Sequence, residues 1–144
     1  MILCHQKRKI YWKLRRGFFY EYGFSGVGIK QIINEANVAN MTLYNHFASK
    51  EELVKEVLKK REERYWSYLD SFQNDQDYSP LINLVLAHGQ WLEKESPQGD
   101  MFLRAIEDFT GINSDIEVIA RGHKSNLLSY LKRISAKVDS SKKR

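Results

Sequence analysis

The chain has 144 residues, of which 42% are hydrophobic and 28% charged, a composition typical of a globular protein that can bury a core. Its single cysteine, Cys4, excludes an intramolecular disulfide framework, and no Cys/His cluster has the spacing of a zinc site. No apolar run approaches the roughly 20 residues of a membrane-spanning helix, and the apolar residues 1–3 are too short for a signal-peptide core. We therefore expect a cytoplasmic protein that needs no metal and no cofactor.

The charge is unevenly distributed along the chain. Residues 1–50 contain eight Lys/Arg and two acidic residues, a net +6, whereas residues 51–144 contain fifteen and sixteen, a net −1. A basic face releases counterions from nucleic-acid phosphates and so supplies non-specific affinity. Solvated surface lysines and arginines would give the same count, so this asymmetry points to nucleic acid only in combination with a motif.

The first third of the chain predicts three helices. Residues 7–22 carry apolar side chains at helical spacing and end before Gly23; these side chains are Ile10, Leu14, Phe18 and Tyr22. Two short helices are expected at residues 29–36 and 40–47. Between them lies Asn37, a residue type that tolerates the left-handed backbone of a helix C-cap. The apolar residues expected to hold this corner together are Ile32, Ile33, Val38, Leu43 and Phe47.

The corner predicts a DNA-binding helix-turn-helix. Two short helices joined by a tight turn have this shape, and the second helix fits the DNA major groove. That helix carries hydroxyl, amide and imidazole groups rather than salt-bridging charges. Hydroxyl groups commonly contact phosphates, while Asn can read a base edge. The candidate DNA-binding residues are Lys30, Asn40, Met41, Thr42, Tyr44, Asn45, His46 and Lys50.

Some of these candidates carry more specific expectations. Asn40 and Met41 lead the recognition helix and are expected to meet bases. Tyr44 is expected to contact a phosphate, although packing at the corner is its alternative role. Lys50 lies in the first turn of the next helix, where a lysine opposes the helix dipole and a phosphate partner would explain it. His46 could touch DNA or hold the corner by a hydrogen bond, and the sequence does not choose.

The remainder of the chain also predicts helices, about seven in total. A capping box at Ser49 and Glu52 opens a long helix that continues to about Phe72. Another helix begins at Ser79–Pro80, a short one spans 101–109, and a second capping box at Ser114 and Glu117 opens a helix to about residue 138. No alternating strand pattern is present, so the fold class is all-α.

The ordered motif resembles a known family. Thr-Leu-Tyr-x-His-Phe at 42–47, followed by Ser-Lys-Glu-Glu-Leu at 49–53, resembles the recognition helix and fourth helix of TetR-type transcriptional regulators. Phe-Tyr-Glu-Tyr-Gly-Phe at 19–24 resembles the end of their first helix. The likeness is strong over residues 16–60 and extends to the rest only in layout. Gly28 and Ala39 depart from it, because Ser or Thr is common at those helix-capping positions.

The resemblance implies a DNA-binding domain at residues 1–48 and a helical ligand-binding and dimerisation region at 49–144. It implies a repressor that binds a palindromic operator in double-stranded DNA as a homodimer and responds to an apolar or aromatic small molecule. The candidate ligand-binding residues are Tyr65, His88, Trp91, Met101, Phe102 and Phe109. Each of these residues has ordinary core packing as its alternative role. His88 and His123 lie singly on apolar faces, which is typical of hydrogen-bonded core histidines.

Two further questions stay open at this stage. Regulators of this type usually continue into two more helices that form the dimer interface, so the sequence is either truncated or dimerises through the exposed stripe of helices 101–109 and 114–138. A helical ligand-binding or protein-interaction domain that has lost operator binding is the alternative function. An enzyme is not expected, since Glu107 and Asp108 are adjacent helical positions that point in different directions, and no nucleophile–base pair or Gly-rich phosphate loop appears.

Overall fold

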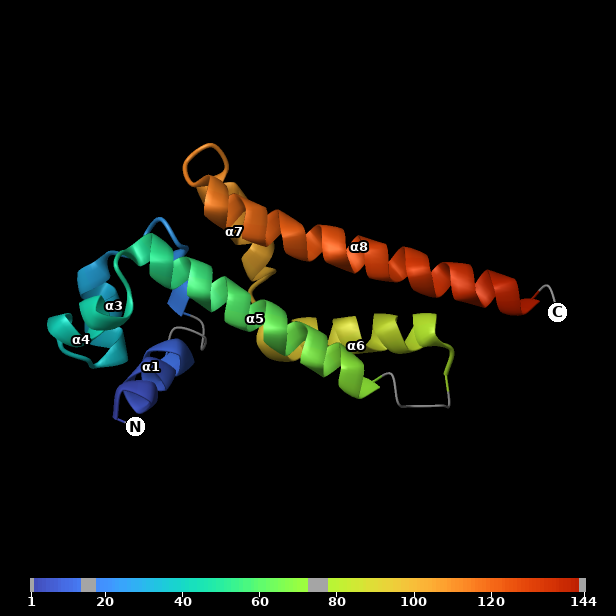
Figure 1. The fold of residues 1–144 in the computed structure, drawn as a ribbon, viewed down its shortest axis with the longest axis horizontal. Coiled ribbons are helices and arrows are strands. Elements are labelled where there is room, and N and C mark those ends of the chain that lie inside the picture. Colours follow the sequence, from blue (N-terminus) through green and yellow to red (C-terminus); the bar gives the residue numbers. More distant parts are fainter. Residues whose placement is uncertain (1, 14–17, 73–77, 143–144) are drawn as a thin grey trace.

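The computed structural model describes residues 2–13, 18–72 and 78–142, which form an elongated arrangement of helices without strands in those ranges (Figure 1). The helical segments are α1 (Ile2–Lys13), α2 (Phe19–Tyr22), α3 (Ile29–Ala36), α4 (Asn40–His46), α5 (Lys50–Phe72), α6 (Pro80–Glu95), α7 (Met101–Phe109) and α8 (Ser114–Lys142). The predicted all-α fold class is confirmed.

The long helix α5 is the axis of the molecule. Helices α1, α3 and α4 gather around its first turns, and α6 packs against its other end (Figure 1). Helix α8 packs against α5 and α6, runs in the same direction as α5 and continues past it. Helix α7 packs closely on α8. The structure therefore places a small helical cluster at one end of a rod and a helical bundle along its length.

Most of the predicted helix boundaries are confirmed, because the residues expected at the helix ends adopt capping conformations or make capping hydrogen bonds. Asn37 adopts the left-handed conformation, with φ 51° and ψ 52°, at the C-cap of α3. Ser49 Oγ accepts a hydrogen bond from the Glu52 amide at 3.1 Å, and Ser79 Oγ accepts one from the Ile82 amide at 3.4 Å. Gly28 caps α3 without a side chain of its own; its amide donates to Gln31 Oε1 at 2.9 Å instead.

Two sequence-based expectations are wrong at helix starts. The first helix begins at Ile2 rather than at Lys7. The start of α8 is capped by Asn113, whose Oδ1 accepts from the Ile116 amide at 3.1 Å, and not by Ser114. Because Asn113 occupies the capping position, the Glu117 carboxylate turns to Arg121 at 2.7 Å instead of closing a box with Ser114.

The apolar face predicted for residues 7–22 is only partly correct. Ile10 is fully buried and Phe18 is half-buried, whereas Tyr22 is 49% exposed. Leu14 lies outside the described residues, as do residues 74–77 of the polar stretch 74–78 that was expected to follow the long helix. Helix α4 ends at His46, one residue earlier than expected, with Phe47 as its C-cap.

Two buried clusters make up the core. The first is continuous from α1 through the helix-turn-helix and the start of α5 to α7 and the beginning of α8, and so crosses the expected boundary at residues 48 and 49. The second joins the end of α5 to α6 and the later part of α8; its buried members are Tyr65, Leu69, Leu84, Ala87, Trp91 and Ile134. Among the described helices, none has an apolar stretch long enough to cross a bilayer.

Candidate functional site

The corner between α3 and α4 is packed as a rigid unit. Ile32 and Ala36 on α3, and Leu43 and Phe47 at α4, are buried, while Ile33 and Val38 pack against them half-buried. The small Ala36 side chain lets the two helices approach closely at the turn. Because the apolar residues of α4 are used for this contact, its polar residues must face away from the corner.

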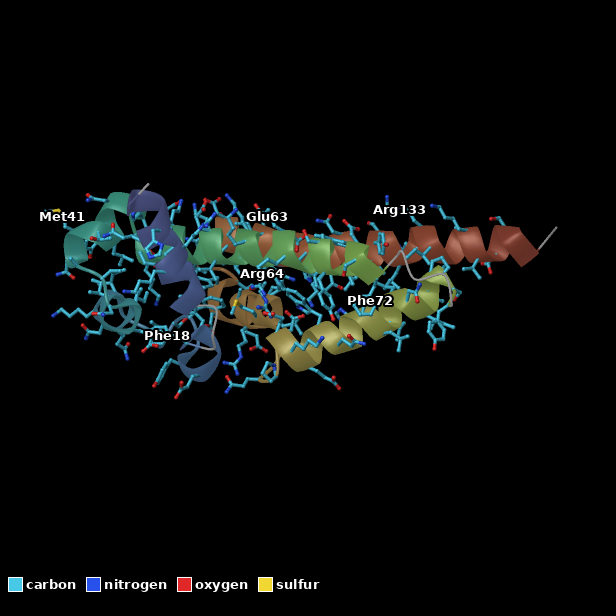
Figure 2. The ribbon with its side chains drawn as sticks, turned by 90° about the horizontal axis from the view of Figure 1, so that it is seen from below. Phe18, Met41, Glu63, Arg64, Phe72 and Arg133 are labelled. Atoms are coloured by element: carbon cyan, nitrogen blue, oxygen red, sulfur yellow. The ribbon has the colours of Figure 1, made fainter. Side chains whose placement is uncertain are left out.

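The outer face of α4 carries most of the predicted DNA-binding residues. Asn40, Met41, Tyr44 and Asn45 are exposed, with Met41 at 72% and Tyr44 at 52%. Their spacing places them on one side of a helix. Figure 2 shows Met41 at the extreme tip of the molecule, remote from Arg133 on α8. Thr42 is half-buried, and Lys30 is exposed at the start of α3.

Lys50 lies at the first residue of α5, beside the tip formed by α4. The free backbone N–H groups of a helix N-terminus attract anions. Ser49 already satisfies the Glu52 amide, and Glu51 and Glu52 add acidic groups to the first turn, which the helix dipole favours. Lys50 adds a positive charge to this turn, which the helix dipole does not favour.

The Nε2 atom of His46 does not make the hydrogen bond at the corner that was one of the two roles expected for this residue. This atom is buried and has no hydrogen-bond partner among the described residues. The ring lies beside Phe47, with the ring centroids 6.2 Å apart. The imidazole therefore packs at the end of α4 instead of presenting Nε2 to a groove.

Four of the predicted ligand-binding residues are linked by ring contacts around Tyr65. The Tyr65 ring meets His88 at 5.8 Å and Trp91 at 5.4 Å between centroids, and meets His123 at 4.8 Å. Phe102 stacks on the other side of His123 at 3.9 Å, with the planes 9° apart. We call this group of Tyr65, His88, Trp91, Phe102 and His123 the aromatic cluster.

The two other ligand-binding candidates are also buried in the first core cluster, to which Phe102 belongs. Met101 is the neighbour of Phe102 in the sequence, whereas Phe109 packs on Phe24 beside the helix-turn-helix, with ring centroids 5.8 Å apart. Phe109 therefore connects α7 to the DNA-binding end of the molecule instead of lining the aromatic cluster.

Comparison with known proteins agrees with this geometry. Residues 16–57 match the family model described as bacterial regulatory proteins, tetR family. Over this segment the chain is similar to the TetR family. The matched segment contains the whole of α3, α4 and the turn between them, which form the DNA-binding helix-turn-helix.

Solved structures extend the likeness to the fold of almost the entire chain. A TetR-family transcriptional regulator from Streptomyces coelicolor matches 92% of this chain and 71% of its own, with a TM-score of 0.83 and 20% sequence identity. A TetR-family regulator from Agrobacterium tumefaciens matches 96% and 74%, with a TM-score of 0.82 and 15% identity. The reduced form of E. coli NemR matches 95% and 72%, with a TM-score of 0.80 and 14% identity. No curated protein sequence matches the chain.

Sequence reasoning missed the polar groups that connect the helices of this chain. The Glu62 carboxylate of α5 accepts hydrogen bonds from His123 Nδ1 and Asn126 of α8, and from Trp66 Nε1 at 2.7 Å. Asp100 caps α7 and also pairs with Lys124 of α8. Long-range partners of this kind leave no local pattern, so only the packing of α5 and α7 on α8 could identify them.

Burial and these contacts shift the pKa values of Glu62 and Tyr65. Partial burial alone would raise the pKa of Glu62, but the hydrogen bonds from His123, Trp66 and Asn126 outweigh it and the pKa lies below its ordinary value. Burial, followed by the nearby Asp100 charge, raises the pKa of Tyr65, so its phenol keeps the proton. Tyr65 Oη lies 2.8 Å from His88 Nδ1 and can donate to it.

His88 gives the folded chain a predicted pH dependence of stability. Burial and then Lys124 lower the pKa of His88 below its ordinary 6.5, so the folded state binds the proton less readily than the unfolded state. Stability contributed by neutral His88 is therefore present above pH 6.5 and is lost as the pH falls from 6.5 through the lowered folded pKa. We expect His88→Gln to flatten the decline in unfolding free energy in that window, measured by urea denaturation at a series of pH values.

The matched control is His5→Gln, because His5 is exposed on α1. This variant should keep the pH dependence of the parent. An unchanged pH dependence in His88→Gln would show that His88 protonates alike in the folded and unfolded states.

Proposed function

We propose that the chain is a cytoplasmic, ligand-responsive transcriptional repressor that binds a palindromic operator as a homodimer. The observation that carries this proposal is the exposed polar face of α4, which stands at the tip of a net-basic N-terminal unit. A recognition helix needs such a face, because its apolar side must hold the corner while its other side meets the major groove.

The DNA contacts divide into two kinds. Asn40 and Met41 at the start of α4 are assigned to base edges, because the first residues of a recognition helix reach deepest into the groove. Tyr44 and Lys50 are assigned to phosphates, which position the protein without reading sequence. Supporting contacts are assigned to Lys30, Thr42 and Asn45, but not to His46, whose Nε2 atom is buried.

The effector is proposed to be an apolar or aromatic small molecule that binds at the aromatic cluster. Helix α5 carries Tyr65 in that cluster and Leu53 and Val57 in the core beneath the helix-turn-helix. A rearrangement at one end of this rigid helix would shift the other end and change the spacing of two recognition helices. The effector can act in this way only if it binds the two arrangements with different affinity.

Selection of bound DNA from a random pool, at a stated salt concentration, tests the proposal. We expect enrichment of a palindrome whose half-sites lie about one helical turn apart. A pool without enrichment, from folded protein that still binds small aromatic compounds, would instead support a helical ligand-binding domain that has lost operator binding.

Asn40 provides a direct test of sequence reading. Asn40→Ala should relax the base preference at one position in each half-site by about 1 kcal/mol and leave non-specific affinity nearly unchanged. The measurement is a binding titration against the selected operator and its single-base variants. Gln90→Ala, which removes an exposed amide from α6, is the control and should change neither quantity. A uniform loss at every base would make Asn40 a backbone contact.

A further inference from the structure

One carboxylate connects α7 to the turn that precedes the helix-turn-helix. Asp108 Oδ2 accepts a hydrogen bond from the Phe24 amide at 2.9 Å and another from the Ser25 amide at 3.2 Å. The two partners are 84 and 83 residues away along the chain. The turn at residues 23–28 leads directly into α3, so this contact holds the backbone from which the helix-turn-helix begins.

The geometry of the turn suits a bound carboxylate. Gly23 has a φ of 70°, which turns the chain so that two successive amides face one oxygen. Successive backbone N–H groups of this kind form a small anion-binding nest. A Cβ at Gly23 would lie 3.7 Å from Asp108 Oδ2, so the carboxylate sits directly against the turn.

Asp108 does not serve its own helix. It lies in the last turn of α7, where the helix dipole disfavours a negative charge. The last turn contains no basic residue to offset it. Its neighbour Glu107 is exposed, whereas Asp108 is half-buried against the turn. The carboxylate is thus explained by the contact that it makes outside the helix.

The opposite end of α7 is fixed in the aromatic cluster. Asp100 caps the helix and pairs with Lys124, and Phe102 stacks on His123. Between Phe102 and Asp108 the helix spans about 9 Å at 1.5 Å per residue. Because α7 is a single short helix, a shift of Phe102 must be transmitted to Asp108 and to the turn that it holds.

We propose that Asp108 is a positioning residue that couples the aromatic cluster to the helix-turn-helix. This inference rests on the proposed function and adds its route of regulation. When the aromatic cluster rearranges, α7 moves and Asp108 pulls on the amides of Phe24 and Ser25. The orientation of α3 and α4 then follows that turn, independently of any movement of α5.

Hydrogen exchange of the full chain without DNA tests this coupling. Phe102→Leu perturbs the aromatic cluster by removing the stacked ring while keeping most of its volume. We expect this change to alter amide exchange in α3 and α4, and we expect Asp108→Ala to abolish that response. Glu107→Ala, the matched carboxylate one residue away, should leave the response intact.

A response that persists in the Asp108→Ala background would overturn the proposal and assign transmission to the Phe24–Phe109 packing or to α5. An absent response to Phe102→Leu in the parent would overturn it as well. If Asp108→Ala fails to fold, Asp108→Asn keeps an acceptor without the charge and is expected to reduce the response. An unreduced response in this variant counts against the proposal. Since no DNA is present, failure here is distinct from failure to select an operator.

Discussion

Replacing Arg61 with alanine is expected to lower the free energy of unfolding by roughly 2–4 kcal/mol. The Arg61 side chain is 3% exposed and donates to the Glu95 carbonyl oxygen at 2.8 Å and to Ser96 Oγ. These groups end α6, where a cation also suits the helix dipole. Its guanidinium lies 5.3 Å from the Trp91 ring centroid. The alanine variant would therefore leave buried acceptors unsatisfied and remove a packed stem, and urea denaturation measures the loss.

A second variant separates the two causes. Arg61→Met keeps much of the apolar stem and removes only the donors, so its loss should be smaller than that of Arg61→Ala. Arg64→Met is the matched control, because Arg64 is more exposed and pairs with Glu95 near the surface. Such pairs contribute roughly 1 kcal/mol or less. Equal losses at positions 61 and 64 would contradict the role assigned to the buried guanidinium.

The sequence was a good guide to helices that are delimited by strong local signals. The helices at residues 29–36 and 101–109 were predicted with the observed bounds. Gly28, Asn37 and Asp100 are residue types that favour helix ends whatever the tertiary packing. The buried corner residues followed from helical periodicity. The outward-facing residues of α4 followed from the same period, since whatever does not hold the corner must point away from it.

The predictions that failed concern the path of the backbone and long-range contacts, which no local sequence pattern encodes. Asn113 and Ser114 are both suitable caps, and the backbone after α7 decides between them. Glu107 and Asp108 were predicted to point in different directions, but the sequence did not indicate that the partners of Asp108 lie in a distant turn. The ligand-binding candidates were selected from an aromatic and methionine-rich region, and packing divides them by placing Phe109 against Phe24.

These contacts add a second physical connection between the aromatic cluster and the helix-turn-helix. Helix α5 alone joins the two regions when the sequence is read as successive helices. In the structure, α7 also reaches both, and the first core cluster runs continuously from α1 to α8. The proposed signal from the aromatic cluster therefore has two possible routes, α5 and α7, and the Asp108 experiment distinguishes them.

Removing both proposed phosphate contacts should weaken DNA binding without changing sequence preference. We expect the double variant Tyr44→Ala/Lys50→Ala to bind all DNA sequences less tightly by about 2 kcal/mol, or roughly 30-fold, since each contact contributes about 1 kcal/mol. Tyr44 lies on the exposed face of α4 and Lys50 lies at the start of α5. Both side chains can therefore contact phosphates of the DNA backbone beside the groove that α4 enters. Binding titrations on the selected operator and on unrelated DNA measure both affinities.

The salt dependence identifies the kind of contact that was lost. Lys50→Ala alone should lower the slope of log affinity against log salt by about one unit, because one fewer phosphate counterion is released. Tyr44→Ala should leave that slope unchanged, since a neutral phenol displaces no counterion. Lys132→Ala removes an equally charged, exposed residue from the far half of α8 and should change neither slope nor affinity. An altered base preference with an unchanged slope in Lys50→Ala would place this lysine on a base edge and not on a phosphate.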